Sequence, residues 1–149
     1  MYAHLIGKKS KTVKNIVERG MVKRFSESIG DEQPIYLDEE TGKNSRYGAN
    51  IAPPTFPRVF DYGEVEGLNL PSKGLIHGEQ VYDYERPLFV GETLSCYTEV
   101  KDYYEKQGKA GLMGFLVMDR HGEDKQGERI FTEQAVIIVT EAVRKGMNV

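Results

Sequence analysis

The chain has 149 residues, a formal net charge of −3 and one cysteine, Cys96. Its length fits a single domain spanning residues 1–149, because domains most often contain about 100–150 residues. A lone cysteine excludes an internal disulfide. The two signs of charge are mixed along the chain, without the basic stripe that marks a nucleic-acid-binding protein. We therefore expect no nucleic-acid partner.

Membrane and metal-binding roles are not indicated either. The longest strongly apolar run covers residues 135–139, far short of the ~20 residues that a membrane span needs. The amino terminus shows no cationic segment followed by an apolar stretch, so no signal peptide is indicated. The sequence predicts a soluble, cytoplasmic protein with no membrane partner. Three scattered histidines and one cysteine offer no metal-ligand spacing, and no nucleotide-binding fingerprint is present. We expect neither a metal nor a cofactor.

The first half of the sequence predicts short elements separated by loops. Residues 13–17 are compatible with a short strand, and residues 18–29 predict a helix because their apolar positions follow one buried stripe. Gly30 ends this helix, since glycine adopts positive φ at low cost. Residues 38–45 predict a second short helix with an aspartate at the N-cap and glutamates in the first turn. Residues 63–74 contain three glycines and a proline and predict an exposed loop.

The second half consists of long segments rich in Val, Ile, Tyr, Phe and Thr, which predict strands. Glycine-bearing breaks separate them, so we expect antiparallel neighbours joined by short turns. The predicted strands are residues 76–84, 93–106, 111–119 and 130–141, and the breaks are residues 87–91, 107–111 and 121–127. One strand, residues 93–106, is much longer than the usual length of about five or six residues. Taken alone, this pattern predicts an α+β domain with an antiparallel sheet in its second half.

Single side chains in this half allow further expectations. Cys96 lies in an alternating run and is expected to be a small buried hydrophobe, because no neighbouring charge would stabilise a thiolate. His121 lies in a predicted break and is expected to be exposed. The successive Tyr103 and Tyr104 are expected to place one ring on each face of a strand, with one of them at a subunit interface.

Two segments carry a resemblance to a known family. Residues 30–38 read GDEQPIYLD, which resembles the hydratase motif Gly-Asp-x-Asn-Pro-x-His-x-Asp of the MaoC-like (R)-hydratase/dehydratase family. Residues 51–56 read IAPPTF and stand where active members carry Ala-His-Gly between two hydrophobic residues. The sequences of these segments are most similar to those of amino-terminal-type MaoC-like subunits. Those subunits resemble the non-catalytic partner in heterodimeric (3R)-hydroxyacyl thioester dehydratases. The similarity covers residues 10–140.

The resemblance implies a hot-dog fold, in which a long curved antiparallel sheet wraps around a central helix. It also implies an acyl thioester as substrate, carried by coenzyme A or by acyl-carrier protein, and a second hot-dog subunit as partner. Addition of water to an unsaturated thioester needs a general base, an acid and a donor for the developing enolate oxygen. In active members an Asp–His pair holds the water, and the glycine N–H of Ala-His-Gly binds the thioester oxygen.

Matched residue by residue, the catalytic candidates are Asp31 and Tyr36, which occupy the positions of the family's aspartate and histidine. A phenol with an ordinary pKa of ~10 is a poor base at neutral pH. Pro54 stands at the glycine of the oxyanion hole and has no N–H, and loss of one such donor costs roughly 10²–10³ in rate. The candidate substrate-binding residues are Ala52, Pro54, Thr55, Phe56 and His77.

Two of these residues have a second interpretation. His77 either faces the acyl-thioester channel or is an ordinary strand histidine bonded to a neighbouring carbonyl or carboxylate. Phe56, together with Phe60 and Tyr62, either lines an acyl tunnel or fills the core beneath the sheet.

Three functional hypotheses follow. In the first, the chain is a non-catalytic subunit that supplies a sheet edge and part of the acyl pocket to a catalytic hot-dog partner. In the second, it is a stand-alone hydratase or thioesterase, with Asp31 as the only base and Tyr36 organising the water. In the third, it is a binding module for acyl-CoA that performs no chemistry.

Overall fold

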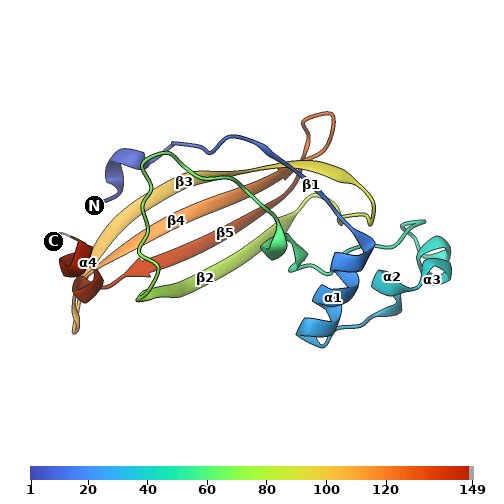
Figure 1. Ribbon diagram of the computed structural model, residues 1–149, viewed down its shortest axis with the longest axis horizontal. Helices are drawn as coiled ribbons and strands as arrows, with labels where there is room; N and C mark the ends of the chain where they lie inside the picture. The colour runs from blue at the N-terminus through green and yellow to red at the C-terminus, as the bar shows by residue number, and fades with distance from the viewer. Residues whose placement is uncertain (148–149) are drawn as a thin grey trace.

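The computed structural model describes residues 1–147, which form one long antiparallel sheet with short helices gathered mainly at one end (Figure 1). The helical elements are η1 (Ala3–Leu5), α1 (Arg19–Ile29), α2 (Pro34–Leu37), α3 (Glu39–Asn44), η2 (Phe56–Val59) and α4 (Glu141–Met147). The strands are β1 (Val13–Ile16), β2 (Leu75–Tyr84), β3 (Thr93–Gly108), β4 (Gly111–Glu123) and β5 (Arg129–Val139). Each helix within this part of the chain is too short or too polar to traverse a membrane.

The sheet has five strands in the order β1-β3-β4-β5-β2, and every neighbouring pair is antiparallel. The predicted strands of the second half are therefore confirmed, as is the long third strand. The strands β1 and β2 form the two edges (Figure 1). Among residues 1–147, β2 pairs with β5 on one side only, so its other edge presents unpaired backbone groups.

Each face of the sheet follows from the strand register. Thr98, Arg120 and Glu133 are opposite one another on β3, β4 and β5 and therefore share one face, which we call the inner face. The segment 60–74 crosses this face together with η2 (Figure 1). Their neighbours in sequence, such as Asp119 and Gln134, point to the opposite or outer face.

The expected fold class is confirmed, but at the place of the central helix the chain forms only one short 3-10 helix. After residue 51 the chain makes only the four-residue 3-10 helix η2 and then runs on as the extended segment 60–74. The physical reason is local. Pro53, Pro54 and Pro57 remove backbone donors and crowd the preceding turn, and Gly63 and Gly67 disfavour helix further along. The predicted loop over residues 63–74 is confirmed.

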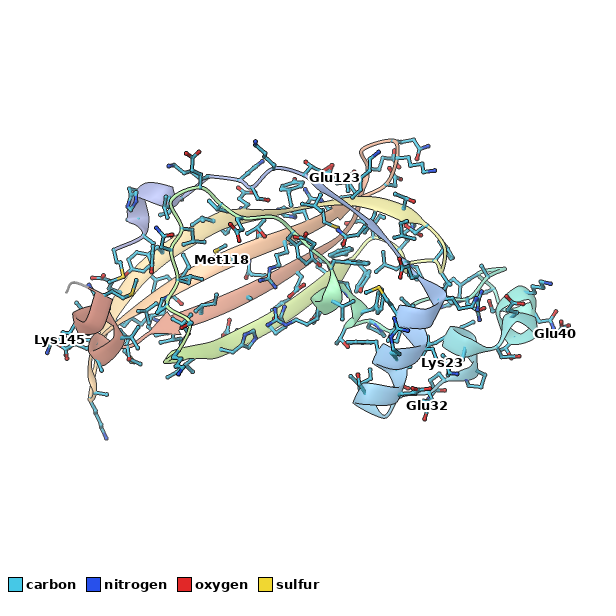
Figure 2. All side chains as sticks on the ribbon, in the orientation of Figure 1. Lys23, Glu32, Glu40, Met118, Glu123 and Lys145 are labelled. Atoms are coloured by element: carbon cyan, nitrogen blue, oxygen red, sulfur yellow. The ribbon has the colours of Figure 1, made fainter. Side chains whose placement is uncertain are left out.

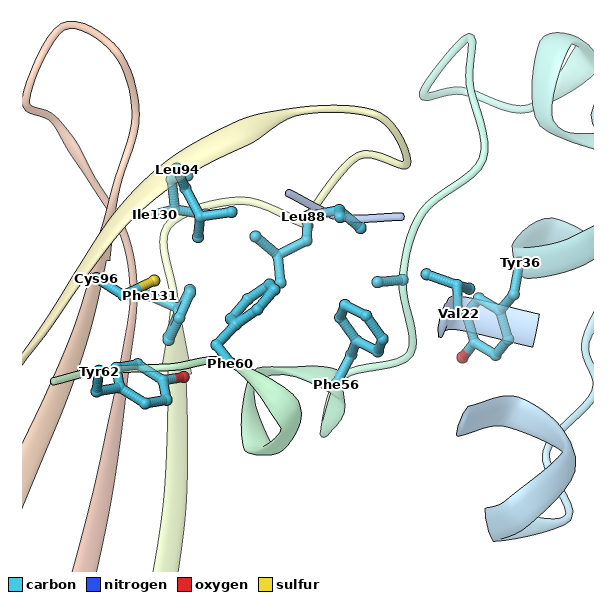
Figure 3. Close-up of a cluster of buried hydrophobic side chains, with 12 residues drawn as sticks. Val22, Tyr36, Phe56, Phe60, Tyr62, Leu88, Leu94, Cys96, Ile130 and Phe131 are labelled. Atoms are coloured by element: carbon cyan, nitrogen blue, oxygen red, sulfur yellow. The ribbon is translucent and has the colours of Figure 1, made fainter. Parts of the chain in front are cut away.

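Two apolar clusters cover the inner face. The first lies beneath η2 and the helical end and is shown in Figure 3; it contains Val17, Val22, Tyr36, Ala52, Phe56, Phe60, Tyr62, Leu88, Leu94, Cys96, Ile130 and Phe131. The second lies beneath η1 and the chain after residue 64 and contains Tyr2, Leu5, Val65, Val100, Tyr103, Leu116, Met118 and Val139. The core interpretation of the aromatic cluster is confirmed. Cys96 is buried as expected, and its burial raises the pKa of the thiol to about 12.

The helical end is stabilised by the caps that the sequence predicts. Gly30 ends α1 with a positive φ of 69°, and the side chain of Asp38 accepts a 2.9 Å hydrogen bond from the N–H of Thr41 at the start of α3. The short helix α2 is not predicted from the apolar spacing. Figure 2 shows Lys23 and Glu32 at this end of the molecule, opposite the end formed by α4.

The expectation of an exposed His121 is wrong. The strand β4 continues to Glu123, so His121 lies within the sheet and is only 6% exposed. In the sequence, Gly122 suggests a turn. In the structure it lies within β4, and the packing requires a glycine there because a Cβ would overlap the ring of Phe131. The turn comes later, where the side chain of Asp124 accepts two 2.9 Å hydrogen bonds from backbone N–H groups.

Candidate functional site

The two candidate catalytic residues lie on either side of the turn between α1 and α2. Asp31 follows the glycine cap of α1, and its N–H donates to the carbonyl oxygen of Ser26 at 3.0 Å. The helix α2 begins at Pro34, as suits proline at a first helical position, and buries Tyr36 in the first apolar cluster (Figure 3). Burial raises the pKa of Tyr36, and the charge and hydrogen bond of Asp31 raise it further. The structure therefore brings Asp31 and Tyr36 together.

This pairing has a definite chemical consequence. Tyr36 keeps its proton at neutral pH, because burial and the nearby charge of Asp31 raise its pKa above the ordinary value of ~10. An imidazole at this position would exchange protons near neutral pH, and the phenol does not. The carboxylate of Asp31 is the one remaining basic group of the pair.

A cavity of about 360 Å³ lies beside the second motif and is lined mainly by apolar surface. Its lining includes Ala52, Pro54, Tyr84 and Leu88. The phenol of Tyr84 donates to the carbonyl oxygen of Pro54 at 2.6 Å, and the N–H of Ala52 donates to the carbonyl oxygen of Leu88 at 2.9 Å. Burial is the main cause that raises the pKa of Tyr84.

The backbone of this segment is therefore poor in donors. Pro53 and Pro54 have no N–H, and the N–H groups of Ala52 and Phe56 are already bonded to backbone carbonyls. A thioester oxygen placed against residues 52–54 would meet carbonyl oxygens and apolar atoms. Residues 52–54 can contact an apolar group, but they offer no free backbone N–H to an oxyanion.

The other candidate residues are distributed over different parts of the fold. Phe56 is a core residue whose ring makes edge contacts with Phe25 and Phe60, while Thr55 is exposed just before η2. His77 is exposed near the N-terminal end of β2, and Tyr84 is the last residue of the same strand. Seven residues of strand separate them by roughly 23 Å at ~3.3 Å per residue. The structure does not bring His77 to the other candidates.

One group of residues on the inner face was missed. Glu133 is fully buried and is surrounded by polar groups of Arg58, Tyr62, Gln80 and Arg120. The alternation of β5 places Glu133 on the same face as Phe131 and therefore signals a buried carboxylate. Its partners come from distant parts of the chain and were not identifiable from local pattern.

The five-stranded antiparallel sheet with its few helices is the hot-dog fold of MaoC-like dehydratases. A family model for the FAS1-like dehydratase domain region matches residues 4–133, and the chain belongs to this family. Among curated proteins, a UPF0336 protein of Streptomyces avermitilis is 32% identical over 124 residues, with 78% of this chain and 79% of that protein covered. A UPF0336 protein of Thermobifida fusca is 29% identical over 129 residues, with 83% and 82% covered.

Solved structures with lower identity share the fold. A chain of the HadBC (3R-hydroxyacyl-ACP dehydratase) complex from Mycobacterium tuberculosis superposes with a TM-score of 0.71, at 17% identity over 91% of this chain and 97% of that chain. A chain of the ChsH1-ChsH2 complex from the same organism has a TM-score of 0.72, at 22% identity over 87% and 83%. The R-hydratase PhaJ1 from Pseudomonas aeruginosa has a TM-score of 0.67, at 19% identity over 91% and 82%.

Proposed function

We propose that the chain is the non-catalytic subunit of a heteromeric (3R)-hydroxyacyl-thioester dehydratase. The proposal is supported by the residues at two matched positions, which offer neither an imidazole nor a backbone N–H. Tyr36 is a buried phenol whose pKa is raised by its burial and by the charge of Asp31, and Pro54 presents a carbonyl that is bonded to Tyr84 in place of a free N–H. The rest of the chain has the fold of the family around both positions.

In this function the chemistry is divided between two chains. The partner supplies the Asp–His pair and the backbone donor, which together activate water and stabilise the enolate oxygen. This chain supplies a sheet edge and apolar surface for the acyl group, including the cavity beside Ala52 and Pro54. Two of the proteins with the same fold are themselves described as complexes, HadBC and ChsH1-ChsH2, which supports a second hot-dog subunit as partner.

The surface proposed for the partner is the free edge of β2. Ile76 and Val81 lie on the outer face of this strand and are 49% and 51% exposed. Unpaired strand edges next to exposed apolar side chains readily pair with another strand. Pairing there would join two sheets and bury these side chains.

Co-expression with a hot-dog chain that has an intact Asp–His pair tests the proposal. We expect a complex on gel filtration and hydration of crotonyl-CoA above that of the partner alone. Val81→Lys should weaken the complex because a charge would enter the paired edge, whereas Ile29→Lys changes a similarly exposed side chain on α1 and should not.

Two results would overturn the proposal. The first is the absence of any complex and of any gain in activity. The second is hydration or hydrolysis of thioesters by the chain alone that is lost in Asp31→Asn, which would make it a stand-alone enzyme. Stabilisation by acyl-CoA with no turnover in any combination would instead favour a binding module.

A further inference from the structure

A row of apolar side chains crosses the outer face of the sheet. Its members are directly opposite one another on β3, β4, β5 and β2 and are Tyr104, Phe115, Ile138 and Ile76. Side chains at directly opposite positions on neighbouring strands point to the same face. The outer face therefore carries four large apolar side chains in line across its four long strands, and we call this line the apolar row.

The apolar row is accessible, above all at its two ends. Tyr104 and Ile76 are 36% and 49% exposed, while Phe115 and Ile138 are half-buried. The rings of Tyr104 and Phe115 stack with their centroids 5.0 Å apart. Tyr103, the preceding residue, is buried in the second apolar cluster on the inner face. Of these two successive tyrosines, one fills the core and the other presents its ring to the outside.

Opposite charges lie on either side of the apolar row on β3. Lys106 and Asp102 are two residues from Tyr104 in the two directions, so both point to the outer face. Both are exposed, and neither forms an ion pair with another side chain in the described part of the chain. Their Cα atoms are roughly 13 Å apart at ~3.3 Å per residue, too far for an ion pair between them. The ammonium of Lys106 instead lies over the rings of Tyr104 and Phe115.

This pattern is complementary to itself when two copies pack face to face. Two such sheets lie about 10 Å apart, with strand directions within about 30° of each other. A two-fold axis along the apolar row places the row of one copy on the row of the other. The same axis places Lys106 of each copy against Asp102 of the other, and Met113 against Val117. An axis along the strands would instead place Asp102 against Glu79, which are two like charges.

We propose that the outer face binds a second copy of this chain through the apolar row, with a Lys106–Asp102 ion pair on each side. This contact leaves the backbone edge of β2 free, so the inference goes beyond the proposed function. The contact covers four strands and reaches from Lys106 to Asp102, which is on the order of 350 Å² per copy at ~4.8 Å between strands. A stable interface buries about 800 Å² per copy. We therefore expect a weak dimer, with a dissociation constant of about 10–100 µM.

Sedimentation velocity of the chain alone, at concentrations from below to above this dissociation constant, measures the association. We expect an equilibrium between monomer and dimer. Phe115→Lys places a charge in the middle of the apolar row and should leave only monomer. Val81→Lys changes the edge strand outside the row and should leave the equilibrium unchanged. A dimer that is lost in Val81→Lys and kept in Phe115→Lys would assign self-association to the edge of β2 and overturn the proposal.

Charge reversal tests the two ion pairs. Lys106→Asp and Asp102→Lys each bring like charges together twice in a dimer of one variant, and each should weaken self-association by about fivefold. An equimolar mixture of the two variants regains both ion pairs in a mixed dimer and should associate as tightly as the unsubstituted chain. Lys125→Asp and Glu128→Lys are the matched controls, because they make the same charge changes in the turn between β4 and β5 and should have no effect. All four positions are exposed, and circular dichroism checks that each variant is folded.

Two further results would overturn the proposal. The first is association that responds to neither charge reversal and is not restored by mixing, a comparison that stands even if Phe115→Lys does not fold. The second is a chain that stays monomeric alone, while folded Phe115→Lys fails to bind a catalytic hot-dog partner, because the outer face would then belong to that partner. Self-association is measured without a partner, so its failure is distinct from failure of the proposed heteromeric complex.

Discussion

The phenol of Tyr84, at the last residue of β2, donates a 2.6 Å hydrogen bond to the carbonyl oxygen of Pro54. This bond ties the end of a strand to the segment that replaces the expected central helix. It also fixes an acceptor, and no donor, at the position where an active hydratase binds the thioester oxygen. The backbone conformation at Pro54 is therefore held by a hydrogen bond from the sheet.

Removal of this bond should have a modest and local cost. Tyr84→Phe is expected to lower the free energy of unfolding by about 1 kcal/mol, the usual net contribution of one hydrogen bond. Urea denaturation measures the change. Tyr104→Phe is the control, because its ring stacks on Phe115 on the outer face and the substitution preserves that stacking. Equal losses in the two variants would show that the Tyr84 hydrogen bond contributes nothing specific.

Restoring the family residues one at a time should separate the two defects. Tyr36→His alone is expected to hydrate crotonyl-CoA only at a trace rate in the isolated chain, because Pro54 still lacks an N–H. The double variant Tyr36→His/Pro54→Gly should exceed it by roughly 10² in rate, as one oxyanion donor is worth. A spectrophotometric hydration assay compares the two. Full activity in Tyr36→His alone, or none in the double variant, would show that Pro54 is not the second defect.

Local pattern was sufficient for most of the sheet and for the ends of the helices. Alternation in residues 93–106 predicted a long strand, and Gly30 and Asp38 marked helix ends that the structure confirms. These features depend on neighbours a few residues apart, which the sequence displays directly. Gly122 misled the interpretation because glycine serves turns and tight packing equally well.

Long-range features were beyond such reasoning. The partners of Glu133 come from η2, β2 and β4, and their convergence depends on a strand register that one sequence does not display. The absence of a long central helix could have been predicted from the sequence, since Pro53, Pro54 and Pro57 lie within five residues and proline disfavours helix. The resemblance to a helix-containing family outweighed that local signal.

Stability should depend on pH through His121. Burial is the main cause that lowers the pKa of His121, and the positive charge of Arg129 lowers it further, while Asp119 and Glu99 act in the opposite direction. Because the folded-state pKa lies below the unfolded value of about 6.5, the neutral ring stabilises the fold above that pH. This contribution is lost as the pH falls through the folded-state pKa.

Urea unfolding at pH 7.5 and at pH 5 measures the effect. Unfolding free energy of the unsubstituted chain should fall at the lower pH, and His121→Asn should reduce that fall. His4→Asn is the matched control, because it removes an exposed histidine near the amino terminus. An identical pH dependence in His121→Asn and in the unsubstituted chain would mean that other groups carry it.

Packing of Gly122 against Phe131 should show strong coupling between the two positions. A Cβ at Gly122 would overlap the Phe131 ring, so Gly122→Ala is expected to cost about 1–3 kcal/mol, as overpacking does. In the background of Phe131→Leu, which removes part of the ring, the same substitution should cost much less. Gly146→Ala in α4 is the control, because a Cβ there meets no atom within 4 Å. A double-mutant cycle from urea denaturation gives the coupling energy. If the two substitutions are additive, β4 relaxes at this point, and the overlap is not what requires glycine at position 122.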